Sequence, residues 1–178
     1  MIAKKNLFTT PRGVAQYQWL NTADTQYDAA GKYKCNLRVA VADAKELMEQ
    51  LKAAATEEFG SKAKTARMPF KVDQETGEVV FSASSKYQPR FVDTTGQLIE
   101  EGQAPQIYGG STLKLAGSLY CYNSGGAGIG ISLQLSGVQV IDLAPPKTVQ
   151  FEAEEGGFVA ANDNGGEKPD DGEVQYNF

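Results

Sequence analysis

Residues 32–42 read KYKCNLRVAVA, and apolar and polar side chains alternate along the whole stretch. Because successive side chains of a strand point to opposite sides, this pattern predicts a half-buried strand with a cationic outer face. The face expected to point inward holds Tyr33, Cys35, Leu37, Val39 and Val41. The face expected to point outward holds Lys32, Lys34, Asn36 and Arg38.

A helix is predicted directly after this strand, at residues 43–59, DAKELMEQLKAAATEEF. Asp43 suits the N-cap, and Glu46 stands three residues later, as in a capping box. Apolar residues such as Leu47 and Leu51 then recur at helical spacing. Gly60 suits the position just beyond the helix, where a residue without Cβ tolerates left-handed backbone geometry.

Further strands are predicted at residues 79–85, 112–122 and 129–143. Residues 112–122, TLKLAGSLYCY, turn leucines inward and Lys114, Tyr120 and Tyr122 outward. The sequence NSGGAG that follows predicts a flexible hairpin turn, and Gly137 predicts a bulge in the last strand. Residues 1–31 are expected to be irregular, apart from a short extended piece around Tyr17 and Trp19.

These elements favour a mainly β protein. About five strands, one capped helix and glycine-rich turns fit an OB-fold, a five-stranded antiparallel barrel with one α-helix after the first predicted strand. A β-sandwich is the competing architecture. We expect residues 1–150 to form this domain.

The last 28 residues differ in composition from the rest of the chain. Residues 1–150 carry a net charge of +2 and residues 151–178 a net charge of −7. Low hydrophobic content with high charge predicts a disordered acidic tail. Such a tail can simply keep the protein soluble. It also suits a basic groove on a partner, through Asp170, Asp171, Glu173, Tyr176 and Phe178. Because carboxylates mimic phosphates, the tail would also suit competition with a nucleic acid for any basic groove on the chain itself.

The composition argues against catalysis and against a bound metal. The chain has no histidine and two cysteines, Cys35 and Cys121, which we expect to be reduced thiols. No phosphate-binding loop and no dinucleotide fingerprint is present. We therefore expect no enzyme, no cofactor and no metal site. The N-terminus shows no secretory signal, and no run has the length of a membrane span, so we expect a soluble intracellular protein without membrane contact.

Cations and outward aromatic rings on neighbouring strands are typical of single-stranded nucleic-acid binding, where cations follow the phosphates and rings stack on bases. The residues predicted to bind phosphates are Lys32, Lys34, Arg38, Lys86, Arg90 and Lys114, with Lys4 and Lys5 on an N-terminal arm. The residues predicted to stack on bases are Trp19, Tyr87, Tyr120 and Tyr122. The alternative is that the outward tyrosines pack under a loop or at a dimer contact.

Three segments carry a resemblance to a known family: GGSTLKL at 109–115, SLYCY at 118–122 and SLQLSGV at 132–138. With the basic start at residues 3–5 and the acidic tail ending in Phe178, the chain resembles the single-stranded DNA-binding proteins of short-tailed coliphages and related tailed phages. The resemblance implies an OB-fold with a helix after the first strand. It also implies coating of single strands during phage DNA replication, recombination and annealing.

The resemblance also implies residue roles and partners. Tyr122 falls on a stacking position of the family, Lys4 on a basic position used for DNA, and Lys86 and Tyr87 near two residues that contact DNA. The tail is expected to contact the phage DNA polymerase and helicase–primase, and to shield the groove when DNA is absent, in the cytoplasm of the infected bacterial host. This chain is shorter before Met68, and it lacks the basic residue that the family has after the stacking tyrosine.

The rival hypothesis is a protein that acts only through protein partners, such as an acidic DNA mimic or an inhibitor of a host nuclease. The tail supports this hypothesis, whereas the outward cationic strands oppose it. A second copy of the chain is a further candidate partner.

Overall fold

The alternation at residues 32–39 is confirmed by the computed structural model, in which Cys35, Leu37 and Val39 of strand β3 are buried. The structure describes residues 6–152, 155–156, 158 and 174–177. Two units are distinguished, Met1–Ala144 and Pro145–Phe178. The elements are β1 (Leu7–Thr9), β2 (Gly13–Asp24), β3 (Lys32–Val39), α1 (Val41–Phe59), the 3-10 helix η2 (Gly60–Thr65), β4 (Phe70–Val72), β5 (Val79–Ser85), β6 (Arg90–Val92), β7 (Thr112–Asn123), η3 (Gly125–Ala127), β8 (Ile129–Asp142), β9 (Thr148–Phe151) and β10 (Val174–Asn177).

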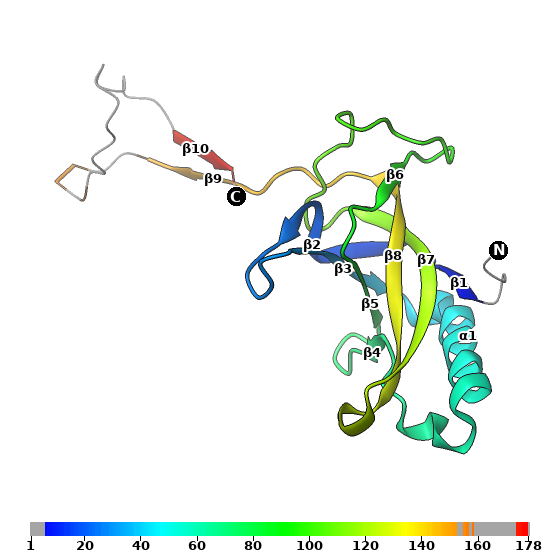
Figure 1. The fold of residues 1–178 in the computed structure, drawn as a ribbon. Coiled ribbons are helices and arrows are strands. Elements are labelled where there is room, and N and C mark those ends of the chain that lie inside the picture. The colour runs from blue at the N-terminus through cyan, green and yellow to red at the C-terminus, as the bar shows by residue number, and fades with distance from the viewer. Residues whose placement is uncertain (1–5, 153–154, 157, 159–173, 178) are drawn as a thin grey trace. The chain divides into compact units, whose positions relative to one another are not determined.

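Five strands of the first unit close a ring in the order β2, β3, β5, β8 and β7, with β7 pairing back to β2. This closure confirms the predicted mainly β OB-like barrel over the sandwich. Four of the five pairings are antiparallel, whereas β5 and β8 run parallel at Ala83 and Leu133. The long strands β7 and β8 form a curved hairpin along one side of the ring (Figure 1).

The inward side chains of the ring and one face of α1 share a single core. From the helix come Ala44, Leu47, Leu51 and Ala55, and from the sheet Phe81, Leu113, Leu115 and Leu133 are among the buried residues. The amide of Gln50 donates to the carbonyl of Leu7 at 2.7 Å, which ties the helix to β1 beside it (Figure 1).

The expectation of an irregular N-terminal region is wrong, because residues 13–24 form the twelve-residue strand β2. Ala15 and Leu20 are both buried, although they stand five residues apart. The pairing with β3 shifts between Gln16 and Trp19, and Tyr17 has a φ of 46°. One extra residue therefore bulges out of β2 and breaks the alternation by which a strand is predicted from sequence.

The helix begins earlier than predicted. Val41 is its first residue and Ala40 its N-cap, whose carbonyl accepts from the Ala44 N–H at 3.0 Å. Asp43 therefore lies in the first turn and makes no capping hydrogen bond, although its charge is well placed for the helix dipole. The end is as predicted, with Gly60 at a φ of 55°.

The bulge predicted at Gly137 is confirmed. Ala116 lies opposite Gly137 and Gly117 opposite Leu135, so Ser136 is the extra residue of β8. The strands approach closely here, since a Cβ on Gly117 would lie 1.8 Å from the carbonyl oxygen of Gln134. The buried set of β8 accordingly changes from Leu133 and Leu135 to Val138 and Val140.

In the second unit, β9 and β10 pair antiparallel. Most of the predicted acidic tail lies outside the described residues, including Asp170, Asp171, Glu173 and Phe178, and so do Lys4 and Lys5. Tyr176 belongs to β10 and pairs with Val149. No helix in the described part of the chain is both long and apolar enough to cross a membrane.

Candidate nucleic-acid interface

A groove of about 400 Å³ lies on the outward face of the ring. Its lining brings together five of the residues predicted to bind DNA with a floor of small polar side chains. The lining residues are Lys32, Ser84, Ser85, Lys86, Tyr87, Tyr120, Tyr122, Ser132, Leu133 and Gln134.

The strand register explains why these residues meet. Ser84 of β5 lies opposite Lys34 of β3 on one side and Gln134 of β8 on the other, and Gln134 lies opposite Ser118 of β7. Residues that pair across neighbouring strands point to the same face of a sheet. The outward positions of four strands, distant in sequence, therefore form one continuous surface.

Two tyrosines of β7 stand on this surface. Tyr120 lies opposite Ser132 and is 54% exposed. Tyr122 lies opposite Gly130 and is half-buried. Their Cα atoms are about 7 Å apart along the strand. Neither ring is enclosed in the core, so both can offer a face to a base.

The segment after β5 supplies the other end of the groove. Tyr87 is 81% exposed, and its N–H donates to the hydroxyl of Ser85 at 3.0 Å. The amide of Gln88 donates to the carbonyl of Asn21 at 3.3 Å, which ties this segment to β2. Lys32 and Lys86, both exposed, line the groove beside Tyr87.

Trp19 extends the outward face onto β2. Because of the bulge at Tyr17, Trp19 pairs with Lys34 and is 43% exposed, whereas Leu20 turns into the core. Trp19 does not line the groove itself, but it lies in the same cross-strand row as Ser84.

Lys34 is engaged by a carboxylate that the sequence analysis did not select. Its Nζ lies 2.5 Å from Asp24 Oδ2, and Asp24 is only 6% exposed. The hydrogen bond from Lys34, together with that from the Gln26 N–H, holds the pKa of Asp24 below its ordinary value. The positive charge of Lys34 is therefore largely compensated within the protein.

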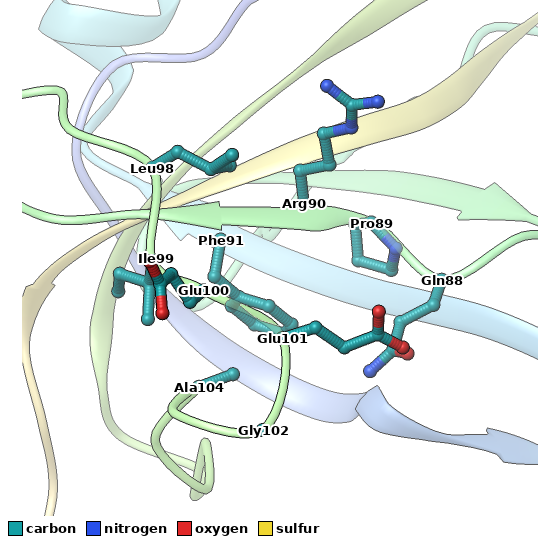
Figure 2. Close-up of a pocket in the computed structure, with 10 residues that line it drawn as sticks. All are labelled: Gln88, Pro89, Arg90, Phe91, Leu98, Ile99, Glu100, Glu101, Gly102 and Ala104. Atoms are coloured by element: carbon teal, nitrogen blue, oxygen red, sulfur yellow. The ribbon is translucent and has the colours of Figure 1, made fainter.

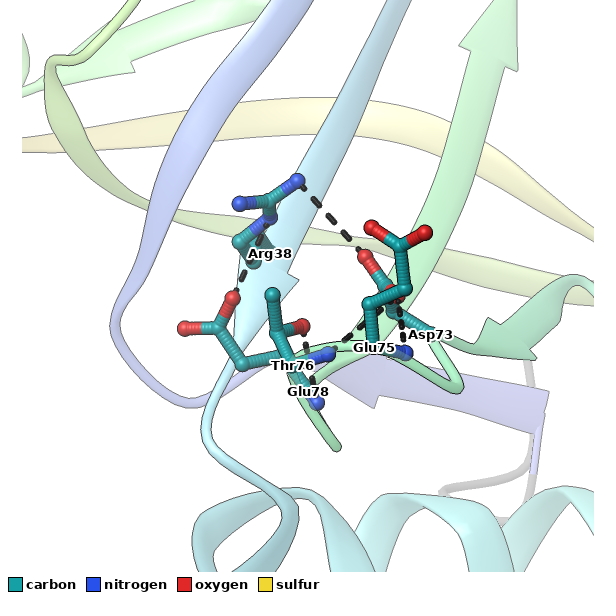
Figure 3. A network of polar contacts seen from close by, with 5 residues as sticks. All are labelled: Arg38, Asp73, Glu75, Thr76 and Glu78. Atoms are coloured by element: carbon teal, nitrogen blue, oxygen red, sulfur yellow. Dashed lines mark hydrogen bonds and ion pairs between the residues drawn. The ribbon is translucent and has the colours of Figure 1, made fainter.

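Arg38 is also paired, at the far end of the same strand (Figure 3). Its Nε lies 3.3 Å from Glu78 Oε2 and its Nη2 lies 3.9 Å from Asp73 Oδ2. The N–H groups of Glu75 and Thr76 hold the pKa of Asp73 below its ordinary value, and the charge of Arg38 adds to this effect. The structure does not place Arg38 in the groove.

Lys114 lies away from the groove, although it points outward as predicted. It pairs with Gln139, whereas Tyr120 pairs with Ser132, and six residues of strand separate the two by about 20 Å. Lys114 instead borders an open hollow beside the start of α1, together with Arg12, Lys45, Asp43 and Glu46.

Arg90 belongs to a second pocket of about 360 Å³, formed by β6 and the loop that follows it. Phe91 is buried, and the side chains of Arg90 and Phe91 leave β6 in opposite directions (Figure 2). Glu100 and Glu101 also line this pocket. Two carboxylates disfavour a phosphate, so this pocket is a poorer nucleic-acid site than the groove.

The two cysteines are both free thiols. Burial raises the pKa of Cys35 to about 12. Burial, with a smaller effect of Glu58, also raises the pKa of Cys121. Neither group is thus activated as a thiolate nucleophile. Within the described residues, no cluster of three potential metal-binding side chains is found.

Sequence analysis missed Ser84, Ser132, Gln134 and Arg67. The first three are ordinary polar residues whose position in a groove depends on strand register. Arg67 follows η2 in a short connection. Its side chain is exposed, and its backbone forms a β-bridge with Gly130 of β8. An arginine in an irregular segment carries no sequence signal of such pairing.

No family model and no curated protein matches the chain. Solved structures do match. The single-stranded DNA-binding protein gp2.5 of bacteriophage T7 superposes with a TM-score of 0.65 at 24% identity, covering 87% of this chain and 98% of that protein.

The single-stranded DNA-binding protein of bacteriophage Enc34 superposes with a TM-score of 0.63 at 18% identity, covering 80% of this chain and 84% of that one. The same protein in complex with single-stranded DNA gives a TM-score of 0.64 at 19% identity, over 80% of this chain and 90% of that one. At such identities the likeness shows the fold. Over most of its length, the chain therefore has the fold of these phage single-stranded DNA-binding proteins.

Proposed function

We propose that this chain binds single-stranded DNA without strong sequence preference. One observation carries the proposal: the rings of Tyr87, Tyr120 and Tyr122 and the cations Lys32 and Lys86 line a single outward groove. Cations that follow phosphates and rings that stack on bases are the two requirements for holding an unpaired strand. The likeness in fold to the Enc34 protein in complex with single-stranded DNA supports the same assignment.

Sequence tolerance follows from the chemistry of the lining. Every base has an aromatic face, so stacking on tyrosine does not select among bases. The hydrogen-bonding groups on the floor are short serine hydroxyls and the Gln134 amide. A bidentate arginine contact of the kind that selects guanine is not part of this lining.

In this proposal the chain coats and protects single strands during phage DNA replication, recombination and annealing, in the cytoplasm of the infected bacterium. It acts by binding rather than by catalysis, and it needs no cofactor. The likeness to proteins of bacteriophages T7 and Enc34 supports this setting.

Titration of a fluorescent oligonucleotide at several salt concentrations tests the proposal. Each phosphate neutralised contributes about −0.7 to the slope of log K against log salt, so Lys32 and Lys86 alone give about −1.4. An unlabelled duplex and an unlabelled RNA serve as competitors. Absence of binding, or binding that does not depend on salt, would contradict the proposal.

We propose further that residues 151–178 compete with DNA for the groove and recruit the phage DNA polymerase and helicase–primase. The support is the net charge of −7 in the tail against +2 in residues 1–150. Deleting residues 151–178 is expected to tighten DNA binding, most clearly at low salt, and to abolish capture of polymerase and helicase–primase. Unchanged affinity after truncation would show that the tail does not compete for the groove.

The same assays address the rival hypothesis of a DNA mimic or nuclease inhibitor. That hypothesis requires the chain to bind proteins in the absence of nucleic acid. It also requires the chain without residues 151–178 not to bind oligonucleotides. A pull-down with and without added nuclease separates the two hypotheses.

A further inference from the structure

The edge of β8 changes its partner beside the groove. β5 pairs with β8 at Ser84 and Gln134. Nearer the start of β8, Gly130 pairs with Arg67 instead. The Arg67 N–H donates to the Ile129 carbonyl at 3.0 Å, and the Arg67 carbonyl accepts from the Ile131 N–H at 2.9 Å. These two hydrogen bonds fix the backbone of Arg67 against the strand.

On the other side of β8, the ring of Tyr122 lies over Gly130. A Cβ on Gly130 would lie 2.4 Å from Tyr122 Oη and 2.6 Å from Tyr122 Cζ, much closer than such atoms approach. It would also lie 2.8 Å from the Arg67 carbonyl oxygen. The backbone at Gly130 is not in the left-handed region, so space rather than conformation requires glycine here.

Tyr122, Gly130 and Arg67 thus form one cross-strand row. Paired residues on neighbouring strands project to the same face, so the Arg67 side chain leaves the sheet on the side that carries the Tyr122 ring. Arg67 is exposed, and within the described part of the chain it forms no ion pair. Its charge is therefore available, in contrast to the charges of Lys34 and Arg38.

We propose that this row is a nucleotide subsite at the end of the groove. A base stacks on the outer face of the Tyr122 ring, Gly130 provides the space in which that ring lies against β8, and the Arg67 guanidinium binds an adjoining phosphate. The subsite rests on the proposed binding of single-stranded DNA and extends the phosphate track beyond Lys32 and Lys86. Gly130 is a positioning residue, because it acts through Tyr122.

The first test compares Arg67→Ala with Lys64→Ala in the full chain. Lys64 is exposed in η2, three residues before Arg67, and its replacement changes the net charge equally. With a labelled oligo-dT, Arg67→Ala is expected to make the salt slope shallower by about 0.7, and Lys64→Ala to leave it unchanged. Equal slopes for the two variants would overturn the role of Arg67.

The second test concerns Gly130. Gly130→Ala is expected to weaken oligo-dT binding about 5- to 150-fold, as Tyr122→Ala does, because both remove the same stack. In a Tyr122→Ala background, Gly130→Ala is expected to weaken binding far less than in the wild-type chain, because only the contact of the new Cβ with the Arg67 carbonyl oxygen remains. A role of Gly130 that does not act through Tyr122 would give the same loss in both backgrounds. If the fold-changes of the two single substitutions multiply in the double variant, the two residues act independently, and the role of Gly130 is overturned.

Circular dichroism and thermal unfolding show whether Gly130→Ala folds. If it does not fold, Tyr122→Phe and Tyr122→Leu test whether a base stacks on the ring at position 122, and they do so without altering β8. Tyr122→Phe keeps the ring and is expected to keep the affinity for oligo-dT within twofold. Tyr122→Leu removes the ring and is expected to lose as much affinity as Tyr122→Ala. Wild-type protein that fails to bind oligo-dT would refute the proposed function itself. Wild-type binding with unaffected variants would refute only the subsite.

Discussion

The two ends of the outward face of β3 carry the same kind of residue in different surroundings. Lys32 stands at one end, exposed beside the tyrosines of the groove, and within the described residues it forms no ion pair. Arg38 stands six residues away, about 20 Å along the strand, and faces Asp73 and Glu78. Alternation places both side chains outward, but only neighbours from other parts of the chain determine whether a cation is available to a ligand.

The largest expected effect comes from removing the aromatic surface at the Lys32 end. Replacing Tyr120 and Tyr122 together by alanine is expected to weaken single-stranded DNA binding by about 2–6 kcal/mol, since each stacked ring contributes about 1–3 kcal/mol. Fluorescence anisotropy with a labelled oligonucleotide measures the loss. Leu98→Ala is the control, because Leu98 is 59% exposed and borders the other pocket. If Leu98→Ala loses a similar amount of affinity, the groove is no more important for DNA binding than the rest of the surface.

The next effect separates the two cations directly. Lys32→Ala is expected to make the slope of log K against log salt shallower by about 0.7, as one phosphate contact is lost. Arg38→Ala is expected to leave this slope unchanged, because its charge already faces two carboxylates. Equal changes in both variants would show that local pairing does not decide which cations meet DNA.

A third variant converts a compensated cation into a free one. Asp24→Asn removes the carboxylate that pairs with Lys34, and it leaves Trp19 and every residue that lines the groove unchanged. DNA binding is expected to tighten, and the salt slope to steepen by up to about 0.7. Weaker binding would indicate that Asp24 matters more for holding Lys34 and the β2–β3 connection in place than for cancelling charge.

The smallest effect concerns stability in acid. The pKa values of Asp24, Asp73 and Asp93 lie below the ordinary value of 3.8, because each carboxylate accepts hydrogen bonds in the folded chain. For Asp93 the main donor is the Thr95 hydroxyl. A lowered pKa in the folded state stabilises the fold above the unfolded-state value, and this stabilisation is lost as pH falls through the lowered values.

The free energy of unfolding is therefore expected to be insensitive to these groups above about pH 5 and to fall below about pH 4. Urea unfolding across this range measures the change. Asp93→Asn is expected to reduce the dependence on pH, since an amide does not titrate. A wild-type stability that does not change between neutral and acidic pH would contradict the assignment.

Strong alternation was sufficient to predict β3, β5, β7 and β8 to within a few residues, and apolar residues at helical spacing predicted α1. Strand β2 was missed because the bulge at Tyr17 places buried Ala15 and Leu20 at an odd spacing. Strands β1, β4 and β6 are three residues each, too short for a periodic signal. The start of α1 was misplaced because Ala40 caps the helix through its backbone, which no side chain reveals.

The sequence alone determined which side of β3, β5, β7 and β8 is buried, because alternation is a local property of neighbouring residues. It thereby placed Tyr120, Tyr122 and Lys32 on outward faces. Only the tertiary structure decided that these residues share a groove, that Lys34 and Arg38 face carboxylates, and that Lys114 lies elsewhere. Strand register and ion pairing join residues that are tens of positions apart, and the order of residues along one strand does not encode which distant strand will lie beside it.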